Sequence, residues 1–411
     1  MKLAVVSHIL PPSPSGQAMV LYRLLKGLPA ESYCLISCED YSRNDRPFSA
    51  ASSRLAGRYY ALTKPEPLQI NVMQRLKLHK TMIVLNTALL IFDWARQLRD
   101  ILRKEHCEAI IACTGHPYDL PAASLAGLLT GLPVIPYLFD DYLYQWIGFD
   151  RTLARWFELS IIKHARSIIV PNEYTQQEYR VRYGVQSTVI HNPCELPDLG
   201  ALDAAERMFD DHETAIVYTG SVYHAHYDAF RNLISSLALL KNANARLHIF
   251  TAQPEEQLVQ NGLSGPQVVY HSHVPQSEVA LLLRKADVLF LPLAFDSPIP
   301  EVIRTSAPGK IGEYLASGRP ILVHAPQDTF ITWYFRKHDC GIVVDNNDPM
   351  VLTTELARLL SDPKHARDMG IRARARAELD FDVDIAVKQF QHIMHGSGQE
   401  LPDYRKGANT D

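Results

Sequence analysis

The sequence predicts an α/β protein built from two doubly wound, Rossmann-like domains, and three observations lead to this fold class. Short apolar runs alternate with helical patterns along the chain, which is typical of a parallel sheet covered by helices on both faces. The 411 residues exceed what one hydrophobic core usually supports, so two domains are expected. The alternation stops once, between residues 193 and 213, where prolines and a charged patch interrupt it.

Composition and charge describe an ordinary globular protein. Hydrophobic residues make up 47% of the chain and charged residues 21%. The net charge of −4 argues against a strongly basic nucleic-acid binder, so no nucleic-acid partner is expected. The six cysteines form no C-x-x-C pair, which favours reduced cytosolic thiols over a disulfide framework. The N-terminal apolar run is too short for a signal peptide, and no run of eighteen apolar residues occurs, so a cytoplasmic location is expected.

Apolar runs in the first half predict six buried strands: Leu3–Ser7, Tyr33–Ser37, Ala109–Ala112, Val134–Tyr137, Ser167–Val170 and Thr188–Ile190. Helical periodicity predicts five helices between them: Gln17–Leu28, Leu85–Lys104, Leu120–Leu129, Leu153–His164 and Tyr174–Tyr183. The stretch Tyr41–Pro67 is rich in Ser, Arg, Asp and Pro and has no clear period, so a long loop is predicted there.

The second half repeats the alternation. Its predicted strands are Thr214–Tyr218, Arg246–Phe250, Val268–Tyr270, Val288–Leu291, Pro320–Val323 and Gly341–Val343. Its predicted helices are Tyr227–Leu240, Gln276–Arg284, Lys310–Ala316, Met350–Leu360 and Asp382–Met394. We therefore expect an N-terminal domain over residues 1–196, a linker over 197–213, a C-terminal domain over 214–381, a final helix over 382–395 and a poorly ordered tail over 396–411.

The stretch Ala307–Val323 is the most informative motif. It reads A-P-G-K-I-G-E-Y-L-A-S-G-R-P-I-L-V, which predicts a Pro-Gly turn at Gly309, a short helix, a glycine stop and an apolar strand. Lys310 and Glu313 are three residues apart, so they share one helical face near the start of the helix. A cation there suits an anion, and a carboxylate can accept two hydrogen bonds from a ribose diol. The motif predicts a nucleotide-diphosphate pocket.

The motif K-I-G-E-Y-L-A-S-G-R-P-I-L also resembles the donor-site helix of glycosyltransferase family 4, a group of retaining enzymes with the GT-B fold. The apolar stretch Ala286–Pro292 resembles the strand that leads into that site. The resemblance is stronger over the C-terminal half of the chain. It implies two Rossmann-like domains facing a cleft, with the nucleotide-diphosphate sugar on the C-terminal domain and the acceptor on the N-terminal domain. It further implies sugar transfer in glycan or cell-envelope polysaccharide synthesis, with retention of anomeric configuration.

By this resemblance, Glu313 corresponds to the second glutamate of the family's E-x7-E motif, which holds the ribose. The first glutamate would fall on Thr305, which is a departure from the pattern. Glu301 lies four residues further upstream, and either its carboxylate or the backbone amides of Ser306–Gly309 could reach the sugar instead. The donor sugar is therefore left open.

Lys310 and Arg304 are the candidate cations for the diphosphate. Charge develops on the leaving nucleoside diphosphate as the glycosidic bond breaks, and fixed cations stabilise it, so no metal is required. The alternative for each cation is a solvated surface charge. The chain also lacks H-E-x-x-H and a cysteine–histidine zinc spacing, so no metal ligands are predicted.

Gly220 and Ser221 follow an apolar strand and form the second anchor of the predicted site. A glycine after a strand lets the backbone approach a phosphate closely. The resembled family usually carries an Arg and a Lys soon after this glycine, whereas this chain has His224 and His226. Asp228 and Arg231 are one helical turn apart, so they are predicted to pair with each other.

Three further candidates follow strands of the N-terminal half. Gly16 lies where the resembled family has a glycine-rich loop near the donor phosphate, and the alternative is a plain helix cap by Ser15. His116 offers a polar group to the acceptor or the donor sugar, and the alternative is a capping or core histidine. Asp140 could hydrogen-bond a sugar hydroxyl, while the adjacent Asp141 points elsewhere and caps the next helix.

Two other functions stay open, and so does a membrane contact. A nucleotide-sugar epimerase of similar fold would need acid and base groups but no acceptor. A non-catalytic nucleotide-sugar-binding protein would fit the missing first glutamate. The Leu68–Lys104 region sets apolar residues beside basic ones, which suits peripheral contact with the inner face of a membrane and a lipid-linked acceptor. The alternative is one long helix that packs its apolar stripe on the sheet.

Overall fold

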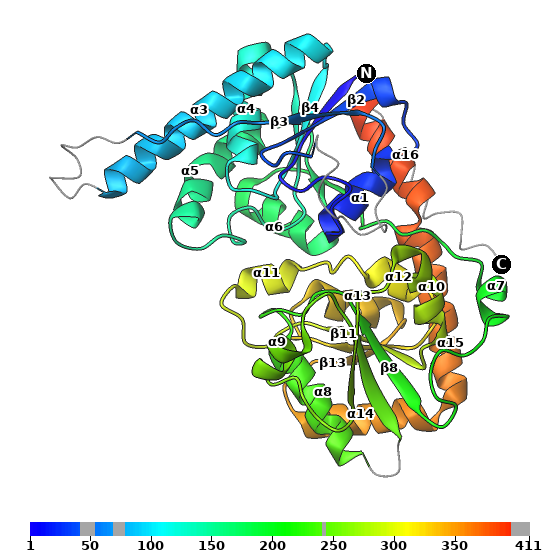
Figure 1. Ribbon diagram of the computed structural model, residues 1–411. Coiled ribbons are helices and arrows are strands. Elements are labelled where there is room, and N and C mark those ends of the chain that lie inside the picture. The colour runs from blue at the N-terminus through cyan, green and yellow to red at the C-terminus, as the bar shows by residue number, and fades with distance from the viewer. Residues whose placement is uncertain (42–53, 69–78, 241–243, 396–411) are drawn as a thin grey trace. The chain divides into compact units, whose positions relative to one another are not determined.

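The computed structural model describes residues 1–41, 54–68, 79–240 and 244–395 (Figure 1). The predicted tail and parts of the Tyr41–Pro67 and Leu68–Lys104 regions lie outside the described residues. The chain divides into two compact units. Unit 1 comprises Met1–Pro171, Thr175–Ile190 and the end of the last helix from Phe390, and unit 2 comprises Asn172–Tyr174 and His191–Gln389.

Unit 1 is built on a seven-stranded parallel sheet in the order β3-β2-β1-β4-β5-β6-β7. Every residue of β1, β2 and β4 is buried, because helices cover both faces of the sheet, and this explains their continuous apolar runs. The strands are β1 (Leu3–Val6), β2 (Tyr33–Ser37), β3 (Arg58–Ala61), β4 (Ala109–Cys113), β5 (Val134–Tyr137), β6 (Ile169–Val170) and β7 (Thr188–Val189).

The helices of unit 1 lie close to their predicted positions. They are α1 (Gly16–Leu25), α3 (His79–Glu105), α4 (Asp119–Thr130), α5 (Gly148–His164) and α6 (Glu173–Tyr183). Figure 1 shows α3 as a long helix whose first turns extend past the strands of this unit. Its second half is anchored in the core by Trp94, Ala95 and Leu98, which are fully buried.

The prediction of an uninterrupted loop over Tyr41–Pro67 is wrong at β3. This edge strand alternates exposed and half-buried residues, so it shows no apolar run. Polar contacts hold it instead: the hydroxyl of Tyr60 donates a hydrogen bond to the carboxylate of Glu105, and Arg58 pairs with the same carboxylate at 3.0 Å. Partners that lie 45 and 47 residues away cannot be recognised from a local pattern.

Unit 2 contains a six-stranded parallel sheet in the order β10-β9-β8-β11-β12-β13. Two apolar clusters pack on its two faces. The strands are β8 (Thr214–Thr219), β9 (Ala245–Phe250), β10 (Val268–His271), β11 (Val288–Pro292), β12 (Ile321–His324) and β13 (Ile342–Val344). The two sheets with their helices confirm the predicted α/β class and the pair of Rossmann-like domains.

Several helices of unit 2 were not predicted from the sequence, among them α9 (Glu255–Gln260), α11 (Pro300–Thr305), α13 (Phe330–His338) and α15 (Pro363–Arg376). The full set is α7 (Leu199–Asp203), α8 (Tyr227–Leu239), α9 (Glu255–Gln260), α10 (Gln276–Lys285), α11 (Pro300–Thr305), α12 (Ile311–Ala316), α13 (Phe330–His338), α14 (Pro349–Ser361), α15 (Pro363–Arg376) and α16 (Val383–His395). The motif helix is α12, and Gly318 ends it with a φ of +65°, a conformation that favours glycine.

Candidate functional site

In unit 2 the two predicted anchors, the end of β8 and the start of α12, lie in contact. The Nζ of Lys310 donates a hydrogen bond of 2.7 Å to the hydroxyl of Tyr218, although 92 residues separate them. The same ammonium lies 3.9 Å from the centre of the Tyr218 ring, a favourable cation–π arrangement. Tyr314 of α12 accepts a hydrogen bond of 3.0 Å from the amide of Thr219. Side chains of one element thus fix the position of the other.

Gly220 forms the closest part of this contact. Its φ is +110°, and a Cβ placed there would lie 3.4 Å from the Nζ of Lys310. A side chain at this position would therefore touch the Lys310 ammonium. The Gly220 amide itself donates to the carbonyl of Phe250 at 2.9 Å, so it stays within the sheet. The lack of a side chain at Gly220 therefore lets the end of β8 lie close to the cation.

The turn after Gly220 is held rigidly by one glutamine. Gln253 accepts a hydrogen bond of 2.6 Å from the amide of Val222 and donates one of 2.6 Å to its carbonyl. The hydroxyl of Tyr218 also donates to the carbonyl of Ser221 at 2.6 Å. Within the described residues, the Ser221 amide has no acceptor, so it remains available to an anion.

Burial sets the electrostatics of this site. It lowers the pKa of Lys310 to about 7, and Glu313 opposes the shift by favouring the charged ammonium. His226 is buried nearby, and burial followed by the charge of Lys310 holds its pKa well below the usual range. Its Nδ1 has no partner among the described atoms. The histidine that stands in the region of the family's usual cations is therefore neutral.

Glu313 lies in the first turn of α12, where Gln276 donates a hydrogen bond of 2.9 Å to its Oε1. Gln276 is the first residue of α10, so this bond joins the starts of two helices. The bond orients the carboxylate, whose two oxygens are acceptors of the kind that ligand hydroxyl groups need.

Two asparagines position the loop between α11 and α12, which contains Gly309. Asn172 donates a hydrogen bond of 2.8 Å to the carbonyl of Thr305, and Asn192 donates one of 2.9 Å to the carbonyl of Ala307. Thr305 itself is only 4% exposed, and its hydroxyl bonds to carbonyls of its own helix. It therefore does not replace the glutamate that the resembled family carries at this position.

Arg304 has a carboxylate partner of its own. Its Nη1 lies 3.9 Å from the Oδ2 of Asp328, and its guanidinium carbon lies 5.9 Å from the centre of the Tyr174 ring. To act on a diphosphate, this cation must exchange the Asp328 contact for the ligand. Asp228 and Arg231 do not pair as predicted, because Asp228 accepts the amides of Phe295 and Asp296. Arg231 donates instead to the carbonyl of Asn261 at 3.2 Å.

In unit 1, Gly16 and His116 lie on neighbouring loops. Ser15 caps α1 by accepting a hydrogen bond of 3.2 Å from the amide of Ala18. A Cβ added at the next residue, Gly16, would have no atom within 4 Å. A Cβ at Gly115 would lie 2.9 Å from the side-chain nitrogen of Gln17, so the two loops touch. The helix cap predicted as the alternative for this segment is present, and Gly16 keeps open space beside it.

His116 is a half-buried, neutral imidazole. Its Nδ1 accepts a hydrogen bond of 3.3 Å from the amide of Tyr118, and its ring lies 5.4 Å from Trp94 and 5.3 Å from His8. Burial lowers its pKa to about 4, with smaller contributions from His8 and Lys64. At neutral pH the imidazole is uncharged, so it can form a hydrogen bond with a ligand hydroxyl group without first releasing a proton.

The buried carboxyl of Asp119 supports this histidine pair. Its Oδ2 accepts the amide of His8 at 2.9 Å, whereas its Oδ1 is buried without a partner in the described part of the chain. Burial raises the pKa of Asp119 to about 8, so the neutral acid is available as a hydrogen-bond donor. His8 and Asp119 were not among the predicted site residues. The sequence indicates His8 by its position alone, because it directly follows the first predicted strand.

Asp140 and Asp141 have different environments, as their adjacency in a loop predicts. Asp141 is buried, pairs with Arg182 at 2.6 Å and accepts the amide of Leu143 at 3.0 Å. Asp140 makes no hydrogen bond within the described residues, and burial raises its pKa to about 7, with a further contribution from Asp141. Asp141 therefore stabilises its own loop and does not cap the next helix as predicted, because the N-cap of α5 is Ile147. Asp140 presents a carboxyl that a ligand can use.

The two parts of the chain match two families. Residues 14–196 match Glycosyltransferase Family 4, and residues 213–362 match Glycosyl transferases group 1. The chain belongs to these glycosyltransferase families. This confirms the family resemblance of the donor-site motif. No curated protein matches the chain in sequence.

Solved glycosyltransferase structures share the GT-B fold over nearly the whole chain. HepE from Anabaena, solved with UDP, aligns with a TM-score of 0.66 at 13% identity over 96% of this chain and 100% of its own. Sucrose-phosphate synthase from Thermosynechococcus elongatus gives 0.66 at 16% identity over 96% and 98%. WaaG, a glycosyltransferase involved in lipopolysaccharide biosynthesis, gives 0.62 at 13% identity over 96% and 100%. At these identities the likeness establishes the fold.

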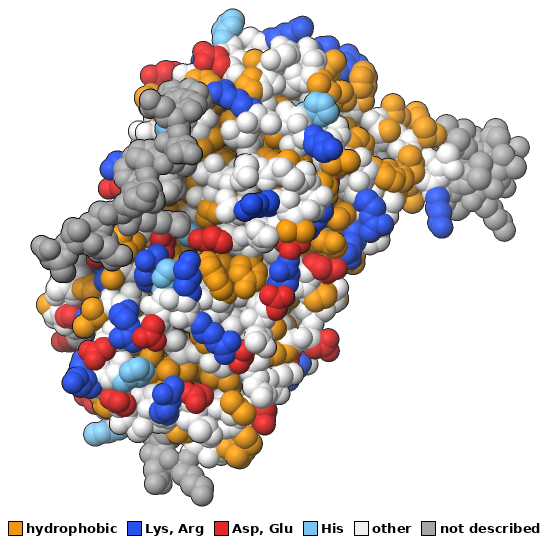
Figure 2. Space-filling view, turned by 180° about the vertical axis from the view of Figure 1, so that it is seen from behind, with side chains coloured by type: hydrophobic (Ala, Val, Ile, Leu, Met, Phe, Trp, Pro, Cys, Tyr) orange, Lys and Arg blue, Asp and Glu red, His pale blue; other side chains and the backbone are white. Residues whose placement is uncertain are grey.

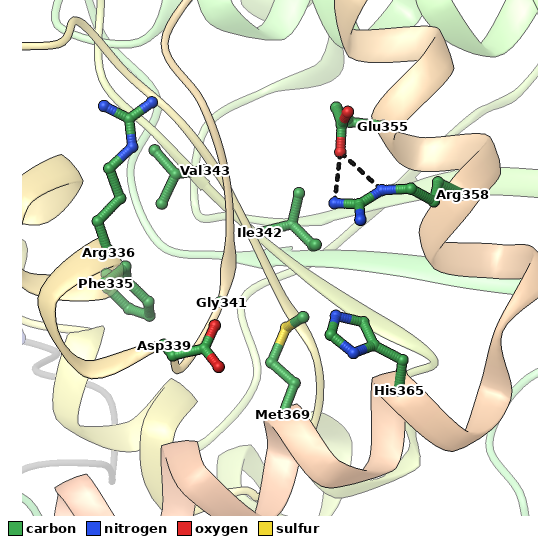
Figure 3. Close-up of a pocket in the computed structure, with 10 residues that line it drawn as sticks. All are labelled: Phe335, Arg336, Asp339, Gly341, Ile342, Val343, Glu355, Arg358, His365 and Met369. Atoms are coloured by element: carbon green, nitrogen blue, oxygen red, sulfur yellow. Dashed lines mark hydrogen bonds and ion pairs between the residues drawn. The ribbon is translucent and has the colours of Figure 1, made fainter.

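A cavity of about 290 Å³ in this glycosyltransferase lies at the β13 edge of unit 2, between α13, α14 and α15, and contains none of the predicted site residues (Figure 3). Its charged rim is compensated: Arg358 pairs with Glu355 at 2.7 Å, and Arg336 pairs with Asp345 at 2.9 Å. Phe335, Ile342 and Met369 supply apolar surface. Its arginines are paired with carboxylates, whereas the Lys310 ammonium contacts the hydroxyl and ring of Tyr218.

The part of the glycosyltransferase that the structure describes contains neither a candidate membrane span nor a candidate metal cluster. No helix there has a stretch long and apolar enough to cross a bilayer. No cluster of three or more His, Cys, Asp or Glu side chains there is arranged to hold a metal ion.

Proposed function

We propose that this glycosyltransferase moves a sugar from a nucleotide-diphosphate sugar to a glycan or lipid-linked acceptor, with retention of anomeric configuration. The observation that carries the proposal is the partly desolvated Lys310 ammonium, which Tyr218 holds beside Gly220. An ammonium in a partly desolvated position interacts strongly with a diphosphate. The complexes of HepE with UDP and with UDP-glucose support a nucleotide sugar as the donor for this chain as well.

Unit 2 supplies the donor contacts in this proposal. Lys310 binds the diphosphate and stabilises the charge that grows on it, while the amides of Ser221 and Gly309 add hydrogen bonds. Glu313, oriented by Gln276, accepts the ribose hydroxyl groups. Arg304 becomes a second cation once the diphosphate replaces Asp328. No metal or other cofactor has a role in these contacts.

Unit 1 supplies the sugar and acceptor contacts. In this proposal Asp140 and the neutral His116 form hydrogen bonds with hydroxyl groups of the sugar or acceptor, and a phosphate or sugar lies beside Gly16. The six cysteines form no disulfide, which suits a reducing, cytoplasmic compartment. We therefore place the reaction in the cytoplasm, at the inner face of a membrane when the acceptor is lipid-linked.

The experiment that tests the donor proposal is thermal stabilisation by UDP, GDP, ADP and their sugars. A ligand at a hundred times its Kd stabilises the folded protein by about 2.7 kcal/mol. Lys310→Met should lose this stabilisation, whereas Lys364→Met, at an exposed lysine of the same unit, should keep it. The proposal is wrong if no nucleotide stabilises the wild type, or if both variants respond equally.

One observation favours a second function, binding of a nucleotide sugar without transfer. Thr305 is buried and bonded to its own helix at the position of the family's first glutamate. Product analysis with and without candidate acceptors separates the functions. A glycosylated acceptor supports transfer, and nucleotide binding without turnover supports the binding protein. A changed sugar nucleotide in the absence of acceptor would instead indicate an epimerase.

A further inference from the structure

Two cysteine thiols contact each other in the core of unit 1, and the proposed sugar transfer does not use them. Cys34 lies on β2 and Cys107 lies in the turn between α3 and β4, and their Sγ atoms are 3.7 Å apart. Both residues belong to the apolar cluster that packs on one face of the sheet. On the lower half of the face shown in Figure 2, acidic and basic side chains are interspersed, so no patch of one charge there indicates a further partner. The thiol pair is the feature whose chemistry the proposed function leaves open.

The fold of unit 1 brings the two sulfur atoms together. Cys107 lies two residues before β4, and β2 and β4 flank β1 in the sheet, so the contact crosses β1. Cys34 is in register with Ala4 of β1, which presents only a methyl group to this face. The amide of Cys107 donates a hydrogen bond of 2.9 Å to the carbonyl of Leu102, which fixes the turn after α3. A small neighbour and a fixed turn therefore leave each thiol facing the other.

The pair needs only a small movement to form a disulfide. Bonded sulfur atoms lie about 2 Å apart, so the two Sγ atoms must approach each other by about 1.7 Å. Rotations of about 30° about the two Cα–Cβ bonds cover most of this distance. The backbone of β2 and of the turn after α3 can therefore stay in place.

Cys107 is the more reactive of the two thiols. A hydrogen bond from the Cys34 thiol lowers the pKa of Cys107, and the ammonium of Lys2 lowers it further, against burial, which raises it. The same hydrogen bond, together with burial, raises the pKa of Cys34. Cys107 is 7% exposed whereas Cys34 is fully buried, so a small oxidant reaches Cys107 first. Because the thiolate is the nucleophile, the reaction starts at Cys107.

We propose that Cys34 and Cys107 form a reversible dithiol–disulfide pair that hydrogen peroxide oxidises. The Cys107 thiolate attacks one oxygen of the peroxide, the O–O bond breaks, and the hydroxide that leaves takes up the proton that Cys107 released. The Cys34 sulfur then attacks the sulfenic acid on Cys107, the S–O bond breaks, and the hydroxyl group leaves as water with the Cys34 proton. In total, two thiols and one peroxide give one disulfide and two water molecules. An external thiol reduces the disulfide and restores both side chains.

Oxidation joins β2 to the end of α3 by a covalent bond. Glu105, two residues before Cys107, already holds the edge strand β3 through Tyr60 and Arg58. The disulfide therefore fixes the turn beside this polar anchor, and it encloses both β3 and α3 in its loop. A cross-link between positions 73 residues apart restricts the unfolded chain, so the oxidised protein should melt about 5–10 °C higher than the reduced protein.

Peptide mapping of the oxidised protein tests the proposal. The reduced full chain is treated with hydrogen peroxide, unfolded, labelled at its free thiols with iodoacetamide and digested without reductant. Wild type should yield a linked peptide of Cys34 and Cys107 and label at the other four of its six cysteines. Dithiothreitol should remove the link. Cys340→Ala is the matched control, because Cys340 is fully buried in unit 2, and this variant should still form the link.

Two single variants test the order of the steps. Cys34→Ala should stop at a sulfenic acid on Cys107, which dimedone traps, because the second thiol is missing. Cys107→Ala should give neither a link nor a trapped acid on Cys34. Circular dichroism checks that each variant is folded, and the map of the wild type decides whether the link forms if either variant is not.

The proposal is overturned if wild type keeps six free thiols at a peroxide concentration that oxidises a cysteine-containing reference peptide. A link that forms only in the unfolded protein, or that joins other cysteines, would also overturn it. A trapped acid on Cys34 in Cys107→Ala would contradict the order of the steps. Equal melting temperatures of the linked and the reduced protein would contradict the restraint on α3.

Discussion

The proposed contact of Lys310 with the diphosphate predicts that nucleotide-sugar binding depends on pH, in a direction that the surroundings of Lys310 define. Burial between the Tyr218 ring and Gly220 lowers its pKa to about 7 in the unliganded protein. Below pH 7 the side chain is mostly charged, and above pH 7 it is mostly neutral. Since a diphosphate binds the charged form, affinity should fall as the pH rises through 7.

The magnitude follows from the ionisation of a single group. With a pKa of about 7, the charged fraction of Lys310 falls about tenfold between pH 6 and pH 8. The dissociation constant should rise by the same factor, about tenfold or ~1.4 kcal/mol. The ligand should be a nucleotide sugar rather than a free nucleoside diphosphate, because both of its phosphates are esterified and keep their charge over this range. Titration calorimetry at pH 6, 7 and 8 measures the slope.

Two variants complete the experiment. Lys310→Met should bind weakly at every pH with no slope, because no charge remains to titrate. Lys310→Arg should also lose the slope but keep more affinity, because a guanidinium stays protonated throughout. An affinity of the wild type that is constant from pH 6 to pH 8 would refute the reasoning. The same slope in Lys310→Met would refute it as well, since another group would then be responsible.

Three further predictions concern separate parts of the protein. Glu313→Ala should weaken nucleotide binding by about 2–4 kcal/mol, because hydrogen bonds to the ribose are lost. Gln276→Ala should cause a smaller loss. If the wild type and both variants bind equally in a thermal-shift titration, the ribose assignment is wrong. Gly220→Ala should destabilise the fold by about 1–3 kcal/mol because its φ is +110°, whereas Gly16→Ala, with no atom near the added Cβ, should unfold like wild type in urea; the opposite order would contradict the conformational argument. Asp141→Ala should destabilise the fold by about 1–3 kcal/mol, because it removes hydrogen bonds to the loop and to Arg182, which keeps Glu158 as a partner at 3.4 Å. A denaturation midpoint close to that of wild type would show that the pair is dispensable.

The sequence predicts the central strands closely, because those strands are buried on both faces. Tyr33–Ser37 and Val134–Tyr137 are found with the predicted bounds, as continuous apolar runs. The edge strand β3 was missed because its partners are polar and distant. Helix α15 was missed for a different reason: its buried residues are Met369, Gly370 and Ala373, which produce little apolar periodicity.

In the candidate site too, the local motif is predicted from the sequence, whereas contacts between residues far apart in the chain are not. The motif around Lys310 and Glu313 identifies a short helix with a cation and a carboxylate, and both lie where the pattern predicts. Neither Tyr218 nor Gln276 could be assigned as their partners, since those contacts span 92 and 37 residues. A pKa near 7 for Lys310 depends on packing around the side chain, which only the folded structure defines.

The two asparagines that hold the loop before α12 stand where the chain passes from one unit to the other. Asn172 begins the short segment of unit 2 that interrupts unit 1, and Asn192 follows the last residue of the unit 1 stretch by two positions. Their side chains donate hydrogen bonds to the carbonyls of Thr305 and Ala307. If the chain moves at either asparagine, the loop that carries Gly309 and Lys310 must move with it, or a hydrogen bond breaks at a cost of about 1 kcal/mol. The position of this loop therefore depends on the course of the chain at the two points where it changes unit. Substituting either asparagine by alanine would remove that dependence and leave every proposed ligand contact in place.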